Sequence, residues 1–302
     1  MTEALIEASG LRFAFDGQPV LDGVDFTVAG GEIYGLVGAD GAGKTTLLRI
    51  VAGQLPMQEG TISVLGKDPQ TPVLRDDIAY MPQGFGLYRD LSVIENMEFF
   101  ADLHSLSSAS TRKKTDDLMK RTGLAGFETR RGSQLSGGMM QKLALACALI
   151  SEPKVMFLDE ATTGVDPVSR RAFWRLLEGV RAEGVAILYA TANMDEAERC
   201  DRVGLLRGGR LVKQGAPIEL LVHGALQFVE ISGQQARERR RHLRDIDGVR
   251  LLYPVGRRLN VWLGAELSIE AFRAKVAEFA LQVEPRRPTL HDVALYDLTN
   301  EP

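Results

Sequence analysis

The feature that most constrains this chain is a glycine-rich turn that joins an apolar strand pattern to a helical pattern. The turn reads Gly38-Ala-Asp-Gly-Ala-Gly-Lys44-Thr45, which satisfies the spacing G-x-x-x-x-G-K-[ST]. Residues 33–37 before it form a short apolar run of the kind found in buried strands. Residues 45–52 after it have helical spacing, closed by Gly53. The order strand, tight loop and helix predicts a phosphate-binding loop.

The chemistry of this loop follows from its residue types. Glycines let a loop curl so that successive backbone N–H groups point at anionic oxygens, and the first turn of the helix adds its positive end. Lys44 supplies a cation for the β- and γ-phosphates, and Thr45 offers a hydroxyl to Mg²⁺. The alternative is a chance glycine turn. The residues predicted to bind the nucleotide are Gly38, Ala39, Asp40, Gly41, Ala42, Gly43, Lys44, Thr45 and Thr46.

A second element is an acidic pair at the end of an apolar run. Residues 155–158 are continuously apolar, and Asp159 and Glu160 follow them. In α/β sheets, ligands bind at the carboxyl ends of the strands. We expect Asp159 to hold Mg²⁺ through water, opposite Thr45, and Glu160 to be the general base that polarises an attacking water. A plain helix cap at the end of a strand is the alternative, disfavoured by the phosphate loop upstream.

A third element is the tetrapeptide Leu135-Ser136-Gly137-Gly138, which precedes a long apolar helical run. Ser136 is a good N-cap residue, and the two glycines remove side chains from that end of the helix. The result is a second exposed helix tip suited to an anion. Because one site for the γ-phosphate is already present, the second tip indicates a partner's nucleotide; the alternative is a plain N-cap.

Residues 4–220, with these motifs in this order, resemble the ATP-binding domain of ABC transporters. The resemblance implies an α/β fold: a P-loop NTPase core of ABC type with an antiparallel β subdomain and a helical subdomain at about residues 90–150. It also implies a head-to-tail dimer with two ATP molecules between the subunits. Leu135, Ser136, Gly137 and Gly138 then serve the partner's nucleotide in trans.

Further roles follow from the same resemblance. Phe15 stands where the family has an aromatic residue that stacks on adenine, although a strand core residue is the alternative. Gln83 matches a glutamine that touches Mg²⁺ and the water and senses the membrane subunit. Asp166 matches the loop that crosses the dimer interface. The implied catalytic residues are thus Glu160 and Gln83, and the implied metal ligands are Thr45, Gln83 and Asp159.

The sequence departs from the family at one position. The family has a threonine–histidine pair after its third strand, whereas this chain has Thr191 followed by Ala192, with Asn193 one position further on. An alanine methyl cannot donate a hydrogen bond to a γ-phosphate, and losing a positioned polar group of this kind typically costs about 10²–10³-fold in rate. We therefore expect ATP to bind well and to be hydrolysed slowly at this chain's own site.

The same departure, with residues 80–88 and 289–298, resembles the first half of YbhF-like tandem ABC exporter ATPases. This implies a chain that is either an excised half or a separate subunit with a competent partner. It also implies function in an exporter. The expected partners are integral membrane permease subunits and a second ABC ATP-binding domain, with a coupling helix near Gln83 and residues 84–103.

The length of 302 residues, at about 150 residues per domain, predicts two domains or one large domain with an appendage. We assign residues 1–221 to the ATP-binding domain and 222–302 to a small α+β accessory domain, similar to the one that follows the ATPase core in drug- and polyketide-exporter ATPases. In the first part we expect strands at 4–8, 11–15, 20–28, 33–37, 155–158 and 186–190 and helices at 45–52, 94–103, 111–121, 168–182 and 194–200. In the second we expect strands at 226–232, 249–253, 259–263 and 281–284 and helices at 234–244, 269–279 and 289–298.

Composition limits the partners and the cellular location that we expect. With 36 basic and 40 acidic residues the net charge is −4, which disfavours a globally basic nucleic-acid binder, and no nucleic-acid partner is expected. Two cysteines fit a reducing compartment. No stretch reaches the roughly 18 apolar residues of a membrane span, and the acidic N-terminus has no signal-peptide pattern. We expect a cytoplasmic protein, peripheral on the inner face of the membrane through membrane subunits.

Two alternatives remain open. One is an ABC ATPase outside transport that acts on RNA or ribosomes. Its support is the arginine-rich run at 237–244, which is short, flanked by Asp245 and Asp247, and typical of a solvated helix face. The other is a regulatory nucleotide-binding module without turnover, for which Ala192 is the reason.

Overall fold

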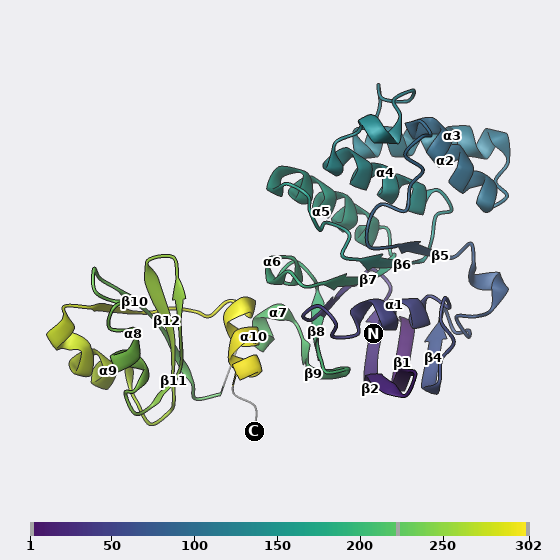
Figure 1. The fold of residues 1–302 in the computed structure, drawn as a ribbon. Helices are drawn as coiled ribbons and strands as arrows, with labels where there is room; N and C mark the ends of the chain where they lie inside the picture. The colour runs from purple at the N-terminus through teal and green to yellow at the C-terminus, as the bar shows by residue number, and fades with distance from the viewer. Residues whose placement is uncertain (1–2, 222–223, 300–302) are drawn as a thin grey trace. The chain divides into compact units, whose positions relative to one another are not determined.

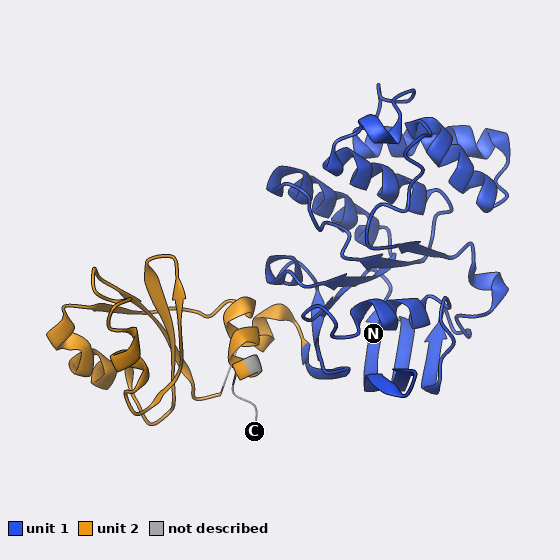
Figure 2. Cartoon of the chain, viewed as in Figure 1, with its two compact units in different colours: residues 1–214 blue, residues 215–302 orange. Residues whose placement is uncertain are grey.

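The computed structural model describes residues 3–221 and 224–299, which fall into two compact units, 1–214 and 215–302 (Figure 2). The sequence-based boundary at 221 lies later, and residue 222 is outside the described residues. The short helix α7 (Pro217–Leu220) contacts helix α10 (Leu290–Thr299), so it belongs with the second unit. The assignment of the units to separate domains stays a prediction.

The first unit begins with an antiparallel sheet in the order β2-β1-β4 (Figure 1). Strand β1 (Ala4–Phe15) pairs with β2 (Gln18–Ala29) and with β4 (Glu59–Val64). The expected separate strands at 4–8 and 11–15 are one strand. Its pairing with β2 shifts register between Ala8 and Leu11, where a bulge absorbs one extra residue without ending the ladder.

The second sheet has the order β5-β6-β7-β3-β8-β9. Its strands are β5 (Ile78–Met81), β6 (Val155–Asp159), β7 (Ala186–Thr191), β3 (Ile33–Val37), β8 (Arg202–Arg207) and β9 (Arg210–Gly215). The four pairs from β5 to β8 are parallel, and every residue of β3, β6 and β7 is buried. Burial on both faces explains the continuous apolar runs. The parallel α/β core predicted from the sequence is confirmed.

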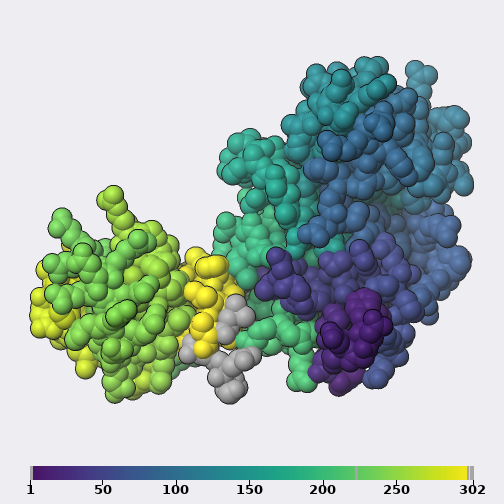
Figure 3. Space-filling model, in the orientation of Figure 1, coloured from purple at the N-terminus to yellow at the C-terminus, as the bar shows by residue number. Residues whose placement is uncertain are grey.

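Some helices of the first unit connect strands of this sheet, and others form a separate group. Helix α1 (Lys44–Val51) follows β3, and α5 (Pro167–Ala182) precedes β7. Helices α2 (Val93–Leu103), α3 (Ser108–Thr122) and α4 (Gly137–Leu149) gather at one end of the first unit (Figure 1), the helical part expected near residues 90–150. In space-filling view these teal and blue residues lie at the opposite end of the unit from the purple N-terminal strands (Figure 3). Among the described helices, none has the length and apolar character to cross a bilayer.

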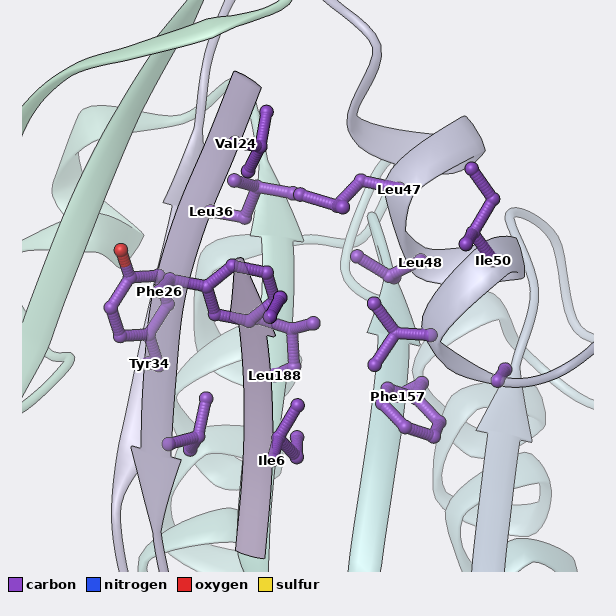
Figure 4. Packing of buried hydrophobic residues seen from close by; sticks show 14 of the residues in the cluster. Ile6, Val24, Phe26, Tyr34, Leu36, Leu47, Leu48, Ile50, Phe157 and Leu188 are labelled. Atoms are coloured by element: carbon purple, nitrogen blue, oxygen red, sulfur yellow. The ribbon is translucent and has the colours of Figure 1, made fainter. Parts of the chain in front are cut away.

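Helix α1 packs against both sheets of the first unit through one shared hydrophobic core. Ile6, Val24 and Phe26 from the antiparallel sheet meet Leu47 and Leu48 of α1, together with side chains of the parallel sheet (Figure 4). Each of the five is at most 4% exposed. Burying a large apolar side chain contributes about 1.5–3 kcal/mol. The packing therefore fixes the position at which α1 begins, and with it the phosphate loop.

The second unit is a four-stranded antiparallel sheet with helices on both faces. Its order is β11-β12-β10-β13, from β10 (Gln227–Ser232), β11 (Val249–Val255), β12 (Arg258–Leu263) and β13 (Gln282–Pro285). Val229 packs with α9 (Ile269–Val276), whereas its neighbour Phe228 packs with Val293 of α10 on the other face. The predicted α+β order is confirmed.

Two expected helices are shorter in the structure. The predicted helix at 234–244 is wrong over most of its length, because only α8 (Arg240–Arg244) is helical. Just two side chains of that segment, Ala236 and Leu243, are fully buried, too few for a continuous apolar stripe, and its closely spaced arginines repel each other. Helix α6 (Met194–Ala197) stops before residue 200, since Asp201 accepts a hydrogen bond from the Ile33 amide (2.8 Å) as the chain enters β8.

Both cysteines should be inert in the folded chain. Cys147 and Cys200 are 2% and 5% exposed, and burial raises the pKa of each thiol. Only the thiolate reacts, so labelling by a maleimide at pH 7.5 should be at least about 100-fold slower in the native chain than in guanidinium chloride. Mass spectrometry of timed aliquots measures this. Fast labelling of the native chain would show that the segments carrying these residues open readily.

Candidate nucleotide site

The loop after β3 has a shape that only glycine permits at two positions. A Cβ atom on Gly38 would lie 2.5 Å from the Leu206 carbonyl oxygen, closer than atoms can approach. Gly43 is the N-cap of α1 and has a φ of 106°. Its Cβ would lie 3.0 Å from the Val20 carbonyl oxygen. The glycines therefore bring the backbone close to its neighbours and let it curl ahead of a helix N-terminus.

Lys44 lies inside this loop. Its side chain is 5% exposed, and Nζ donates to the carbonyl oxygens of Gly38 (2.9 Å) and Ala39 (3.1 Å). Nζ also lies 3.3 Å from Oε1 of Glu160 and 3.9 Å from Oδ1 of Asp40. The loop thus holds one buried cation, which a phosphate oxygen can share.

Asp159 ends β6 and is 1% exposed. Its Oδ2 accepts a hydrogen bond from the Tyr80 hydroxyl (3.3 Å), whereas Oδ1 is buried with no hydrogen-bond partner. Burial raises the pKa of Asp159, and a hydrogen bond with Thr45 opposes that rise. A carboxylate oxygen left without a donor, beside a threonine hydroxyl, is a donor set that fits Mg²⁺.

Glu160 is held from several sides. Its backbone has a φ of 49°, a left-handed conformation that costs a non-glycine residue about 1 kcal/mol. Its amide donates to the Ala190 carbonyl oxygen (2.9 Å), which ties it to β7. Oε2 accepts hydrogen bonds from Gln83 Nε2 (3.1 Å) and Thr163 Oγ1 (3.4 Å). A turned backbone with an oriented carboxylate is the kind of strained position that collects at functional sites.

Gly43, Lys44 and Glu160 line one cavity of about 370 Å³, whereas Gly38 and Asp159 are not among its lining residues. Phe15 also lines it and is 48% exposed, with its ring against Phe13 (centroids 4.8 Å apart). The interpretation of Phe15 as a strand core residue is therefore excluded. The residues that line the cavity are Phe15, Val20, Asp40, Gly41, Gly43, Lys44, Thr45, Thr46, Gln83 and Glu160.

The tetrapeptide at 135–138 is outside this set. Leu135 ends the short turn η2 (Gly132–Gln134), and Ser136 caps α4 by accepting a hydrogen bond from the Met139 amide (3.3 Å). A Cβ on Gly137 would meet nothing within 4 Å, whereas one on Gly138 would lie 2.2 Å from Ser169 Oγ. The tip of α4 is thus bare at Gly137 and closely packed at Gly138.

Asp166 caps the neighbouring helix α5. Its Oδ1 accepts hydrogen bonds from the amides of Ser169 and Val168, both at 3.0 Å. The bonds with Ser169, and then that with Val168, lower the pKa of Asp166. Because Gly138 packs on Ser169, the tip of α4 and the start of α5 form one local structure.

Ala192 lies just beyond β7 and is exposed. Asn193 does not take its place: the Asn193 side-chain oxygen accepts a hydrogen bond from the Asp195 amide (3.0 Å) and so caps α6. Thr191 is buried, and its carbonyl oxygen accepts a hydrogen bond from the Gly38 amide (3.3 Å). The end of β7 therefore adjoins the phosphate loop through a backbone hydrogen bond.

Sequence reasoning missed some of the residues that shape the site. Tyr80 donates a hydrogen bond to Asp159, and Thr163 donates one to Glu160. The buried Glu196 accepts one from Thr191. Thr163 is three residues from Glu160, a spacing that could have indicated a local hydrogen bond. Tyr80 and Glu196 gave no such signal, because their contacts depend on strand pairing and folding.

A glycine loop before a helix, a buried cation and an acidic pair at the end of a parallel strand define a P-loop nucleotide-binding fold. The ABC transporter family profile matches residues 21–163. The Nod factor export ATP-binding protein I of Rhizobium sp. (strain N33) is 36% identical over 79% of this chain and 80% of its own length. This chain belongs to the family of ABC transporter ATP-binding proteins.

Two further relatives differ in how much of their length this chain covers. The probable multidrug ABC transporter ATP-binding protein YbhF of Escherichia coli (strain K12) is 45% identical over 72% of this chain, which spans 38% of that protein. The daunorubicin resistance ATP-binding protein DrrA3 of Streptomyces coeruleorubidus is 31% identical over 98% of this chain and 96% of its own length. The similarity to DrrA3 thus extends through the second unit.

Solved structures agree with the fold. A structure described as the ATP binding subunit of an ABC transporter is 30% identical, with a TM-score of 0.65 over 72% of this chain and 91% of its own. The CbiO1 structure from Clostridium perfringens, described as part of the ABC transporter complex CbiONQ, is 30% identical, with a TM-score of 0.67 over 72% of this chain and 90% of its own. The ABC-type fold class predicted from the sequence is confirmed.

We predict that Gly38→Ala weakens nucleotide binding. The new methyl would clash with the Leu206 carbonyl oxygen, so the loop must move. Its backbone N–H groups would then no longer point at the phosphates. The dissociation constant for Mg·ATP, measured by isothermal titration calorimetry, should rise at least about tenfold.

The matched control is Gly179→Ala, in the interior of α5, where an added Cβ meets nothing within 4 Å. It should leave the affinity unchanged and stabilise the chain by about 0.5–1 kcal/mol. Equal affinities for Gly38→Ala and the parent would show that the shape of the loop does not govern binding.

Proposed function

We propose that this chain is the ATP-binding subunit, or one ATP-binding half, of an ABC exporter. The observation that carries the proposal is the convergence of Lys44, Thr45, Gln83 and Glu160 on one cavity beside a glycine loop. The relatives' names, which include multidrug, Nod factor export and daunorubicin resistance proteins, support the assignment to export.

In the proposed reaction the loop amides and Lys44 bind the phosphates, and Phe15 stacks on adenine. A water attacks the γ-phosphorus, Glu160 accepts its proton, and the bond to the ADP oxygen breaks. Gln83 donates to Glu160 at 3.1 Å and so holds the carboxylate in its orientation. Thr45, Asp159 and Gln83 would hold Mg²⁺, which supplies charge neutralisation at the phosphates.

Ala192 sets the rate in this proposal. Its methyl has no hydrogen-bonding group, and Asn193 is engaged as the cap of α6. The cradle for the phosphates is intact while one donor for the γ-phosphate is missing. We therefore propose tight binding with slow turnover at this chain's own site.

Residues 136–138 at the tip of α4 and Asp166 do not line the cavity of this chain, which supports a role in trans. We propose a head-to-tail dimer with a second ABC ATP-binding domain, in which the bare backbone at Gly137 meets the partner's γ-phosphate. Permease subunits would dock near Gln83 and residues 84–103, at the cytoplasmic face of the membrane. The second unit would add dimer contacts.

A regulatory module without turnover is the second candidate, favoured by Ala192 alone. Glu160 separates the two candidates. In a single-turnover assay of the purified chain, Glu160→Gln should abolish hydrolysis if this chain does its own chemistry. An unchanged rate would favour the regulatory module.

We predict that Lys44→Ala weakens Mg·ATP binding at least about 100-fold, because the loop loses its one buried cation. Equilibrium binding of a fluorescent ATP analogue measures the change. Lys142→Ala, on α4, is a matched control at a partly exposed lysine outside the cavity, with no expected effect. Unaltered binding by Lys44→Ala would overturn the nucleotide site itself.

We predict that Ala192→His raises the single-turnover rate about 10²–10³-fold, since it restores a donor at the γ-phosphate. Ala192→Leu adds bulk without a donor and should stay at the parent rate. The gain should vanish in the double variant with Glu160→Gln. If Ala192→His leaves turnover unchanged in the presence of a competent partner domain, the proposed cause of slow hydrolysis is wrong.

A further inference from the structure

A buried carboxylate lies beneath the end of β7. Glu196, on α6, is 4% exposed. Its Oε2 accepts hydrogen bonds from Thr191 Oγ1 (2.7 Å) and the Tyr189 hydroxyl (3.1 Å). Its Oε1 accepts one from Thr162 Oγ1 and lies 3.6 Å from Arg170 Nε. Both oxygens of one buried acid are thus fully engaged.

These partners come from different elements. Tyr189 and Thr191 belong to β7, Arg170 belongs to α5, and Thr162 lies in the loop that carries Glu160 and Asp166. Arg170 also donates from its guanidinium to the Val165 carbonyl oxygen (3.3 Å), one residue before Asp166. Glu196 is therefore the point at which the end of β7 is joined to the 162–166 loop.

The same network reaches the nucleotide site through the backbone. The Gly38 amide donates to the Thr191 carbonyl oxygen (3.3 Å), and the Glu160 amide donates to the Ala190 carbonyl oxygen (2.9 Å). A continuous set of contacts therefore runs from the phosphate loop, through Thr191 and Glu196, to Thr162 and the start of α5. Such a chain of buried hydrogen bonds can transmit a displacement.

We propose that Glu196 is a positioning residue that couples occupation of the phosphate loop to the 162–166 loop and Asp166. The proposal rests on the proposed function, in which Asp166 serves the dimer interface. In a chain with alanine at 192, this buried route lets a slowly hydrolysing site still signal its bound nucleotide. A carboxylate suits the role because its two acceptor oxygens engage donors from separate elements at once.

The chain carries its own reporter of this network. Trp174, on α5, is fully buried, and its ring lies 4.9 Å from that of Tyr189, whose hydroxyl bonds Glu196. The sequence has two tryptophans, and the other, Trp262, is in the second unit. Trp262→Phe therefore leaves Trp174 as the single tryptophan of the full chain.

The test is a titration of the full-length Trp262→Phe chain with Mg·ATP and with Mg·ADP, followed by tryptophan emission. We expect Mg·ATP to change the Trp174 emission more than Mg·ADP does. Adding Glu196→Gln should reduce the ATP response at least about fivefold, with the dissociation constant within about twofold of the parent, because Glu196 does not line the cavity. A residue needed only for folding would not separate response from affinity.

Matched variants keep the test decisive. Glu32→Gln alters another buried glutamate, 9% exposed and paired with Arg202 at 3.1 Å, and should leave the response intact. Thr162→Val removes one donor with little change of shape and should reduce the response, whereas Thr162→Ser should retain it. If thermal melting shows that Glu196→Gln does not fold, the difference between the two Thr162 variants decides the test.

Two results would overturn the proposal: a full ATP response in Glu196→Gln and Thr162→Val, or no ATP response in a parent chain that binds Mg·ATP. Failure of the parent to bind Mg·ATP by calorimetry is a different outcome. It would overturn the proposed function, and the proposal with it.

Discussion

The parallel ladder β6-β7-β3 is the constraint on which the site depends. Its register sets Val37 opposite Thr191 and Asp159 opposite Ala190, so three strands end at the same edge. Parallel strands joined by helices carry their loops to that edge. The phosphate loop, the acidic pair and Ala192 are therefore neighbours, although they are far apart in the chain.

The charged residues among these neighbours lie in different electrostatic environments. Lys44 is nearly inaccessible and lies against two backbone carbonyls and Glu160, so its charge is directed into the loop. Asp159 is deeper still, and burial raises the pKa of its carboxyl while Thr45 opposes the rise. A nearby divalent cation would stabilise the charged form of that acid, so metal binding and the charge of Asp159 reinforce one another.

Local signals were sufficient for β3, α1, β6 and the cap at Ser136, because a strand end, a glycine turn and an N-cap are each fixed by a few adjacent residues. Strands β4, β5, β8 and β9 were missed, since their alternation is weak or their length short and only their pairing partners define them. The helix expected at 234–244 failed for a related reason: charge pattern alone did not show how little of it the core would bury. The Glu196 network was beyond prediction, because four separate segments must fold before its donors meet.

In the proposed function, ATP binding and ATP hydrolysis depend on different groups near Ala192. The loop that would bind the phosphates consists of backbone amides and one lysine, and its shape depends on packing against Leu206 and Val20. None of these contacts involves the side chain at 192. The attack on the γ-phosphate, in contrast, needs side-chain donors and a base in one geometry, so losing one donor slows chemistry without loosening the loop. We therefore propose that a substitution confined to residue 192 leaves the loop and its internal contacts as they are and lowers only the rate of the chemical step.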